Sequence, residues 1–223
     1  MRFDQRVVMV TGAAGNLGRA VAAAFRELGA ILVLLDVKAE GSIIAATDLR
    51  DAASVQQAVD RTLERHKRID VLCNVAGGFR MGPALHETPE ADWDFLFDLN
   101  AKSVLHTARA VVPAMLRQGS GKIVNVGAYA AQKGAAAMGA YVASKSAVIR
   151  ITETMAAELR QKNINVNCVL PTIIDTPENR AAMPQADPRR WVAPQDLAAV
   201  IVFLASDAAR AIHGAAIPVT GLS

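Results

Sequence analysis

Short runs of apolar residues alternate with longer amphipathic segments along the chain. The apolar runs predict buried β-strands at residues 7–10, 31–35, 43–46, 71–75, 123–126, 164–170 and 216–219. The amphipathic segments predict helices at residues 17–28, 51–66, 94–117, 140–161 and 195–206, and in the second of these Val55, Val59 and Leu63 recur at a spacing of four. We therefore expect strands and helices to alternate from one end of the chain to the other.

This alternation predicts an α/β fold with a doubly wound, mostly parallel seven-stranded sheet of the Rossmann type. Buried parallel strands joined by right-handed helical crossovers carry helices on both faces. No repeat, low-complexity segment or linker interrupts the 223 residues, so we expect one domain over residues 1–223. The irregular segment from Pro171 to Ala193 is long enough for a loop or a small lid over a binding site.

Composition and charge exclude several classes of protein. The formal net charge is only +3, and the basic residues form no cluster typical of a nucleic-acid-binding surface. No apolar stretch reaches the length of about 18 residues that a membrane span needs, and the first residues lack the layout of a signal peptide. No metal site is predicted. We expect a cytoplasmic protein that binds neither nucleic acid nor membrane.

The two cysteines support an intracellular location. Cys73 and Cys168 lie in separate predicted strands with one strand between them. Neighbouring strands are about 4.8 Å apart, so the two thiols are expected about 10 Å apart, too far for a disulfide. Two reduced, buried thiols are typical of the reducing compartments of the cell.

A glycine-rich segment follows the first predicted strand and opens the first helix: Thr11-Gly12-Ala13-Ala14-Gly15-Asn16-Leu17-Gly18. Glycines permit a tight turn and close approach of the backbone to a pyrophosphate, which the helix N–H groups and dipole then hold. Any strand-to-helix turn can use glycine, but this one occupies the first βα turn. Asp36 follows 18 residues after Gly18, at the end of the second strand.

Asp36 has the position of the acid that binds both ribose hydroxyls of a dinucleotide and repels a 2′-phosphate. The sequence therefore predicts binding of NAD(H) in preference to NADP(H). The nearby cation Lys38 weakens that preference. A solvated loop acid is the alternative interpretation of Asp36.

Three segments together resemble the short-chain dehydrogenase/reductase family: the glycine turn, Asn74-Val75-Ala76-Gly77, and Tyr141-Val142-Ala143-Ser144-Lys145. The resemblance covers nearly the whole chain, and Tyr-x-x-x-Lys is its most specific part. The chain departs from the family at Asn16, where the turn usually has glycine, but asparagine tolerates left-handed backbone well enough for the turn to form. The resemblance implies this set of cofactor-binding residues: Gly12, Gly15, Asn16, Leu17, Gly18, Asp36, Asp48 near the adenine, Asn74, Ala76, Gly77, Tyr141, Lys145, Pro171, and Ile174 and Thr176 beside the nicotinamide amide.

Tyr141 and Lys145 are four residues apart on one predicted helix, so their side chains share a face. A neighbouring ammonium favours the phenolate and lowers the tyrosine pKa from its usual value of about 10. The resemblance implies that Tyr141 is the catalytic acid, Lys145 its electrostatic partner and a ligand of the nicotinamide ribose, and Asn100 the holder of a water behind the lysine. Without the resemblance, Tyr141 and Lys145 would be an ordinary surface pair and Asn100 an ordinary polar helix residue.

The serine that donates a hydrogen bond to the substrate carbonyl in this family is missing. It stands thirteen residues before the tyrosine, where this chain has Ala128. Loss of such a donor typically costs a few kcal/mol of transition-state stabilisation when the reaction needs it. Neighbouring Tyr129 is an alternative donor whose direction the sequence does not give.

Four features resemble the quinonoid dihydropteridine reductase branch of the family: Gly127-Ala128, the segment 73–78, the segment 170–187, and Trp191. That branch lacks the serine, uses NADH and is dimeric. The resemblance implies hydride transfer from NADH to a flat conjugated ring, with Tyr141 as proton donor and the segment 175–191 as one pocket wall. Trp191 either stacks on that ring or packs the loop onto the body of the protein.

Two other functions stay open. One is a general carbonyl or alcohol dehydrogenase, such as a 3-oxoacyl thioester reductase, that tolerates Ala128. The other is a non-catalytic dinucleotide-binding sensor or scaffold, against which the intact Tyr141 and Lys145 argue. The resemblance also makes the helices at 94–117 and 140–161 the expected surface of a homodimer or homotetramer, because they carry more small and apolar residues than one buried face needs; these include Ala108, Ala110, Val111 and Val112.

Overall fold

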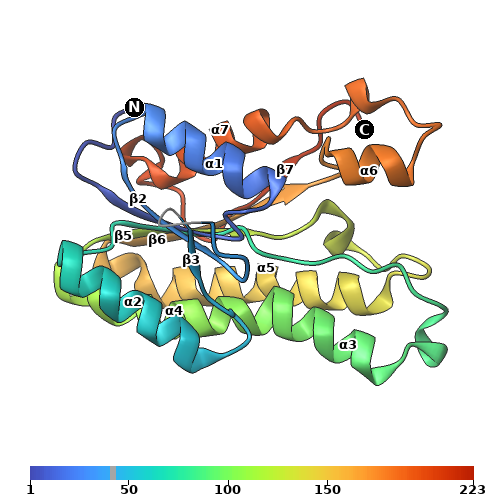
Figure 1. The fold of residues 1–223 in the computed structure, drawn as a ribbon, viewed down its shortest axis with the longest axis horizontal. Coiled ribbons are helices and arrows are strands. Elements are labelled where there is room, and N and C mark those ends of the chain that lie inside the picture. The colour runs from blue at the N-terminus through green and yellow to red at the C-terminus, as the bar shows by residue number, and fades with distance from the viewer. Residues whose placement is uncertain (41–43) are drawn as a thin grey trace.

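Seven parallel strands form one sheet in the order β3-β2-β1-β4-β5-β6-β7 (Figure 1). The structure is a computed structural model that describes residues 1–40 and 44–223. The strands are β1 (Val7–Thr11), β2 (Ile31–Asp36), β3 (Ile44–Ala46), β4 (Val71–Asn74), β5 (Gly121–Val126), β6 (Ile164–Pro171) and β7 (Ala216–Val219). Every pairing between neighbouring strands is parallel, which confirms the predicted α/β sheet.

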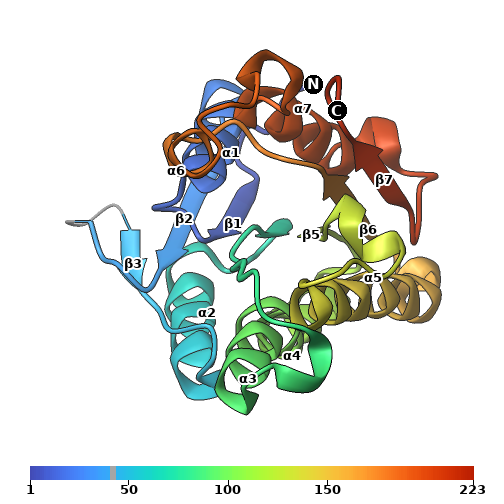
Figure 2. The same ribbon diagram turned by 90° about the vertical axis from the view of Figure 1, so that its right-hand side faces the viewer.

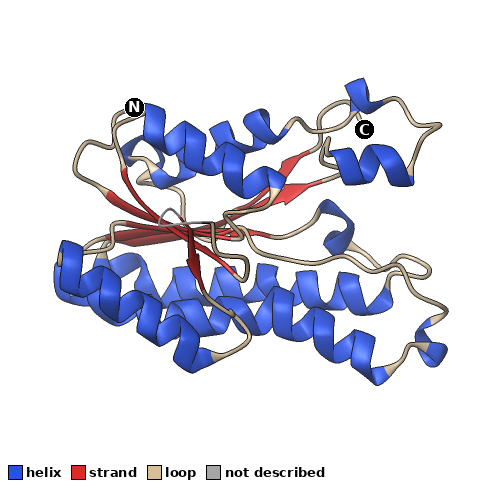
Figure 3. Ribbon diagram, viewed as in Figure 1, coloured by secondary structure: helices blue, strands red, loops and turns tan. Residues whose placement is uncertain are grey.

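Two layers of helices enclose the sheet (Figure 1, Figure 3). Helices α1 (Asn16–Glu27) and α7 (Pro194–Ala205) cover one face, and α2 (Ala52–His66), α4 (Ser103–Gln118) and α5 (Gly139–Leu159) cover the other. Helices α3 (Glu90–Phe97) and α6 (Pro177–Ala182) lie at one end of the molecule, and Figure 2 shows the sheet and its helices from that end. Short 3₁₀ helices span Leu85–Glu87, Tyr129–Gln132, Arg160–Lys162, Pro188–Arg190 and Asp207–Ala209.

Alternation along β1 sends its side chains into two separate cores. Val8 and Val10 pack with residues of α1 and α7, while Met9 between them packs with residues of α2 and α4. Because both faces of the sheet are covered, every residue of β1, β4, β5 and β6 is buried. This explains why the strands appear in the sequence as continuous apolar runs.

The prediction of a single helix at residues 94–117 is wrong. The structure instead has α3, a π-helical turn at Asp98–Lys102, and α4, and the helical segment starts earlier, at Glu90. Pro89 precedes α3, and its fixed φ suits the start of a helix. A π-helical turn holds one extra residue, which the apolar pattern does not reveal.

The segment after β6 is more regular than its sequence suggested. It contains the short helix α6, which begins at Pro177 and is capped by Thr176, whose hydroxyl accepts a hydrogen bond from the Asn179 N–H at 3.2 Å. The third strand begins at Ile44 in the described part of the chain, and Ile43, with which we expected it to start, lies outside the described residues.

One strand lies between the two cysteines, as predicted. Cys73 of β4 lies opposite Val124 of β5, and Cys168 of β6 lies opposite Asn125, so β5 separates the two thiols. Both cysteines are free and buried. Across the described residues, the helices are too short or too polar to span a bilayer.

Candidate active site

The glycine turn is tightly packed against its own backbone and against the loop after β4. Gly12 leaves β1 with a φ of +66°, and a Cβ added there would lie 2.8 Å from the Cα of Ala76. A Cβ on Gly18 would lie only 2.1 Å from the carbonyl oxygen of Gly12. Both positions therefore need glycine, one for its backbone conformation and close approach, the other for space.

Helix α1 starts directly from this turn with its first N–H groups uncapped by any side chain. Gly15 is the N-cap residue and Asn16 the first helical residue. Asn16 is absent from the residues of positive φ, so the turn does not need the left-handed backbone that we expected asparagine to tolerate. Uncapped N–H groups at a helix N-terminus, after a turn of glycine and alanine at residues 12–15, suit an anionic pyrophosphate.

Asp36 is held beside the same turn. One carboxylate oxygen accepts a hydrogen bond from the Ala14 N–H at 3.0 Å, and the other accepts one from the Lys38 N–H at 3.0 Å. Each oxygen keeps a further lone pair for a ribose hydroxyl. The turn and Asp36 together therefore fit the pyrophosphate and adenosine ribose of a dinucleotide.

Thr11 joins the glycine turn to the loop after β4, a role that sequence reasoning missed. Its hydroxyl accepts hydrogen bonds from the Val75 N–H at 3.1 Å and the Ala76 N–H at 3.2 Å. The only sequence signal was its place at the end of β1, directly before Gly12. These two bonds hold the Val75–Ala76 backbone, directly before Gly77.

Lys145 and Asn100 meet at Gly77. A Cβ on Gly77 would lie 2.9 Å from the Lys145 Nζ and 3.0 Å from the Asn100 Oδ1, so both side chains reach the same point of the backbone. The Lys145 ammonium also donates a hydrogen bond to the Val126 carbonyl at 2.8 Å. Tyr141 lies one turn earlier on α5, so the structure brings together the three predicted catalytic residues.

Asn100 is a clamp between the loop after β4 and helix α5. Its Oδ1 accepts from the Gly78 N–H at 2.8 Å, and its Nδ2 donates to the Gly78 carbonyl at 3.1 Å and to the Ser144 hydroxyl at 3.0 Å. The π-helical turn presents this buried side chain, and such turns are frequent at functional sites. Its partners here are backbone and hydroxyl groups of the protein itself.

Comparisons with known proteins support the family resemblance. Residues 6–187 match the model of a family described as short chain dehydrogenase. The chain belongs to the short-chain dehydrogenase family. D-threitol dehydrogenase of Mycolicibacterium smegmatis is 35% identical to it, over 99% of this chain and 93% of that protein. The 3-oxoacyl-(acyl-carrier-protein) reductase FabG of Thermotoga maritima is 32% identical, over 99% of this chain and 98% of that protein.

Solved structures lead to the same family. An NAD+-bound xylitol dehydrogenase superposes with a TM-score of 0.91 at 28% identity, covering 99% of this chain and 100% of that one. This short-chain dehydrogenase is thus an oxidoreductase enzyme with the fold of nicotinamide-dependent relatives. The similar proteins differ in the substrates that their names record. The substrate of this chain must therefore be inferred from its own residues.

Burial sets the protonation of Tyr141 and Lys145, the predicted catalytic pair of this short-chain dehydrogenase. It raises the pKa of Tyr141 to about 12 and lowers the pKa of Lys145 to about 8. The predicted lowering of the tyrosine pKa by the lysine is therefore wrong for the protein alone, because burial outweighs the lysine, whose ammonium is bonded to Val126. At neutral pH Tyr141 therefore keeps its proton, and Lys145 is protonated in most molecules.

The surroundings of the Tyr141 ring are apolar. Its ring contacts Phe79 edge-on, with 4.9 Å between the ring centroids, and it also packs against a small cluster that includes the buried Ala128. Tyr129 is 43% exposed, and Phe79 is 56% exposed despite its contact with Tyr141. Sequence reasoning missed Phe79, because the contact depends on how the loop after β4 folds onto α5.

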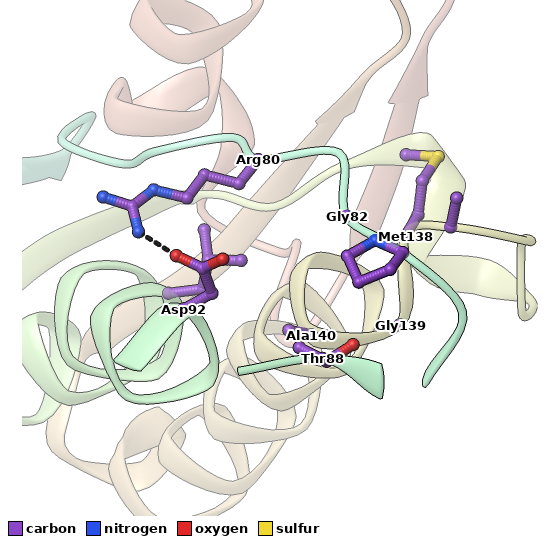
Figure 4. A pocket seen from close by; sticks show the side chains of 10 residues that line it. Arg80, Gly82, Thr88, Asp92, Met138, Gly139 and Ala140 are labelled. Carbon is purple, nitrogen blue, oxygen red and sulfur yellow. Dashed lines mark hydrogen bonds and ion pairs between the residues drawn. The ribbon is translucent and has the colours of Figure 1, made fainter. Parts of the chain in front are cut away.

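A small pocket lies between the loop after β4, helix α3 and the start of α5 (Figure 4). Arg80 and Asp92 form an ion pair on one side of it, and Met138, Gly139 and Ala140 form the other. Its internal volume is about 10 Å³, room for roughly one water molecule. The guanidinium of Arg80 also lies 3.8 Å from the centre of the Phe95 ring, which braces this wall of the site.

Two predicted cofactor residues, Asp48 and Asn74, bond to other side chains of the protein. Asp48 pairs with Arg50 at 2.8 Å, which lowers the pKa of its carboxyl. Asn74 is buried in a side-chain network, where it accepts from Thr107 at 2.9 Å and donates to Asn125 at 2.8 Å. Its amide is therefore held by side chains of the protein, and its role at the cofactor site stays a prediction.

The segment from Pro171 to Trp191 contacts the glycine turn through α6. The Asn16 amide donates a hydrogen bond to the Glu178 carboxylate at 2.8 Å, which places α6 with Thr176 beside the start of α1. The Asn179 amide donates to the Ile174 carbonyl at 2.8 Å and holds that residue. Trp191 is only 8% exposed, which favours packing of the loop over stacking on a substrate ring.

Proposed function

We propose that this short-chain dehydrogenase uses NADH to reduce a flat conjugated acceptor, such as a quinonoid dihydropterin. The supporting observation is that Tyr141 packs against the cluster of Ala128, so a proton donor is present while an alanine stands where a carbonyl-polarising hydroxyl belongs. An already conjugated ring needs hydride and one proton, whereas a ketone also needs its oxygen polarised. The exposed Phe79 ring beside Tyr141 offers such a ring an apolar surface.

In this proposal, different residues of the chain bind the cofactor and transfer the proton. The glycine turn binds the pyrophosphate, Asp36 the adenosine ribose, and Lys145 the nicotinamide ribose. The bound nicotinamide supplies the hydride. Tyr141 gives its hydroxyl proton to the substrate and regains it from solvent, while Asn100 keeps the Gly78 backbone in place.

Asp36 supports the preference for NADH within this proposal. A 2′-phosphate would bring its negative charge next to the carboxylate that is bonded to Ala14. Replacing Asp36 by alanine should narrow the difference between the dissociation constants of NADH and NADPH, measured by fluorescence titration. A wild-type protein that binds NADPH more tightly would show that the role given to Asp36 is wrong.

A second candidate function is supported by the names of the relatives. Threitol and xylitol dehydrogenases and a 3-oxoacyl reductase are all similar to this chain. They favour a general alcohol or carbonyl dehydrogenase that works with Ala128. A non-catalytic dinucleotide-binding protein is a third candidate, but the assembled Tyr141, Lys145 and Asn100 argue against it.

One experiment separates the three candidates: NADH consumption by the wild type and by Ala128→Ser over a quinonoid dihydropterin, simple ketones and acetoacetyl thioesters. For the ring reductase, the serine should leave ring reduction nearly unchanged and raise ketone reduction, because its hydroxyl polarises the carbonyl. For a carbonyl reductase, it should raise activity by about 10²-fold, and no ring should exceed the ketones. A binding protein should bind NADH without turnover in both forms.

We also propose that the protein is a homodimer or homotetramer assembled from second copies of this chain. An apolar groove of about 590 Å³ runs between α4 and α5, and Leu105 beside it is 47% exposed. The predicted surface residues Ala108 and Val112 line this groove, whereas Val111 is fully buried in the core. Multi-angle light scattering at micromolar concentration should give at least twice the monomer mass, and a monomer would refute the assembly.

A further inference from the structure

A chain of contacts surrounds the first βα turn and ends at Glu40. Asp36 accepts from the Ala14 N–H, and the Ala14 carbonyl accepts a hydrogen bond from the Arg19 Nε at 3.0 Å. The other end of the Arg19 guanidinium forms an ion pair with the Glu40 carboxylate. Arg19 is therefore a cation bonded directly to the residue that bonds Asp36.

The backbone fixes the position of Glu40. Its N–H and carbonyl exchange hydrogen bonds with Ile44, both at 3.3 Å. Ile44 begins β3 and lies opposite Leu34 of β2, the strand that ends in Asp36. Glu40 is thus held at the same end of the sheet as Asp36, and its carboxylate reaches Arg19 from there.

We propose that Glu40 is a second determinant of cofactor selectivity, acting through Arg19. This inference rests on the proposed dinucleotide site. A 2′-phosphate carries a charge of about −1.5 to −2 at neutral pH. Beside the Asp36 carboxylate it would need a cation as counter-ion. Arg19 is the cation bonded to this turn, and Glu40 already neutralises it. Asp36 repels the phosphate directly. Glu40 acts indirectly, because it neutralises Arg19, the cation that would otherwise pair with the phosphate.

The pair is suited to mutation because it lies at the surface. The side chains of Arg19 and Glu40 are 54% and 44% exposed, so losing their ion pair should change stability little. Lys38 is the competing cation, because it is exposed in the same loop and its N–H is bonded to Asp36. The test must therefore distinguish Arg19 from Lys38.

The experiment measures dissociation constants of NADH and NADPH, by nucleotide fluorescence, for the wild type, Glu40→Gln, Asp36→Ala and the double variant. Freeing Arg19 should tighten NADPH binding by about threefold in the wild-type background and about tenfold without Asp36. NADH binding should change by less than about twofold, because the ribose diol needs no counter-ion. The exposed Glu64→Gln on α2 is the control, with the same change of net charge and no contact to the turn.

Adding Arg19→Ala decides the mechanism. It should abolish the gain from Glu40→Gln, whereas Lys38→Ala should leave the gain intact. A gain that survives Arg19→Ala, or one that Glu64→Gln reproduces, would overturn the proposal. So would an unchanged NADPH-to-NADH ratio in Glu40→Gln, with NADH still bound. A wild type that binds neither nucleotide would refute the proposed function itself, and the inference with it.

Discussion

The proposed cofactor side and the proposed substrate side of the site are built by different means. Around the glycine turn the backbone forms the surface, and Gly12 and Gly18 leave no space for a side chain. Around Tyr141 side chains form the surface, with Phe79 and Ala128 coming from separate loops. A change on the first side should displace the backbone, whereas a change on the second should alter chemistry and leave the fold intact.

The largest expected effect tests the substrate side. Tyr141→Phe removes one hydroxyl and keeps the ring that packs against Phe79. Ketone reduction should fall by about 10²- to 10⁴-fold, since the general acid is lost. Ring reduction should fall less, because water can protonate a ring nitrogen. Steady-state NADH oxidation with each substrate measures both, and the melting temperature should stay within a few degrees of the wild type.

Tyr129→Phe is the matched control, because it removes the same group from a side chain that is 43% exposed. We expect its rates to stay within about twofold of the wild type, as for most surface changes. A loss of ketone reduction comparable to that of Tyr141→Phe would contradict this. It would show that Tyr129 supplies the hydroxyl that Ala128 lacks.

The next effect tests the cofactor side. In Gly18→Ala the new Cβ would meet the Gly12 carbonyl oxygen at 2.1 Å, so the turn must open. Forcing atoms into packed space costs about 1–3 kcal/mol, enough to weaken NADH binding by about 5- to 150-fold and to lower the melting temperature by several degrees. Isothermal titration and thermal unfolding measure these quantities.

Gly15→Ala in the same turn is its control. There the Cβ would lie 3.4 Å from the Gly12 oxygen, an ordinary contact, and the backbone φ is −76°. Binding of NADH should remain close to that of the wild type. Equal losses in both variants would mean that any side chain in the turn blocks the pyrophosphate, and that steric strain at Gly18 is not the cause.

The same contrast explains what could be predicted from the sequence. The glycine turn and Asp36 lie at strand ends, and strand ends follow from the apolar pattern, so their proximity could be expected. The Tyr141–Lys145 spacing likewise placed both side chains on one face of α5. The contact of Phe79 with Tyr141 and the Arg19–Glu40 pair could not be predicted, because each depends on the course of a loop.

The spacing of residues in the sequence also did not reveal the burial of Tyr141 or the π-helical turn at Asp98–Lys102. The spacing predicted a lysine near Tyr141. It did not predict the desolvation that raises the pKa of the tyrosine. Asn100 was found through a motif, yet its clamp on Gly78 depends on a π-helical turn inside an unbroken apolar pattern. Both features arise from tertiary packing.

The smallest expected effect concerns pH, and it links the two sides through Lys145. The pKa of this lysine is lowered to about 8, while that of Tyr141 is raised to about 12, so between pH 7 and pH 9 the lysine loses its proton and the tyrosine keeps it. A neutral lysine no longer stabilises the phenolate that forms when Tyr141 gives up its proton. The rate of reduction under saturating NADH should therefore fall by about tenfold in all between pH 7 and pH 9, with an inflection near pH 8. Lys145→Arg should have a lower rate at every pH but lose this inflection, because a guanidinium stays charged throughout the range. A wild-type profile that is flat from pH 7 to pH 9, or an inflection that Lys145→Arg retains, would show that another group controls proton transfer.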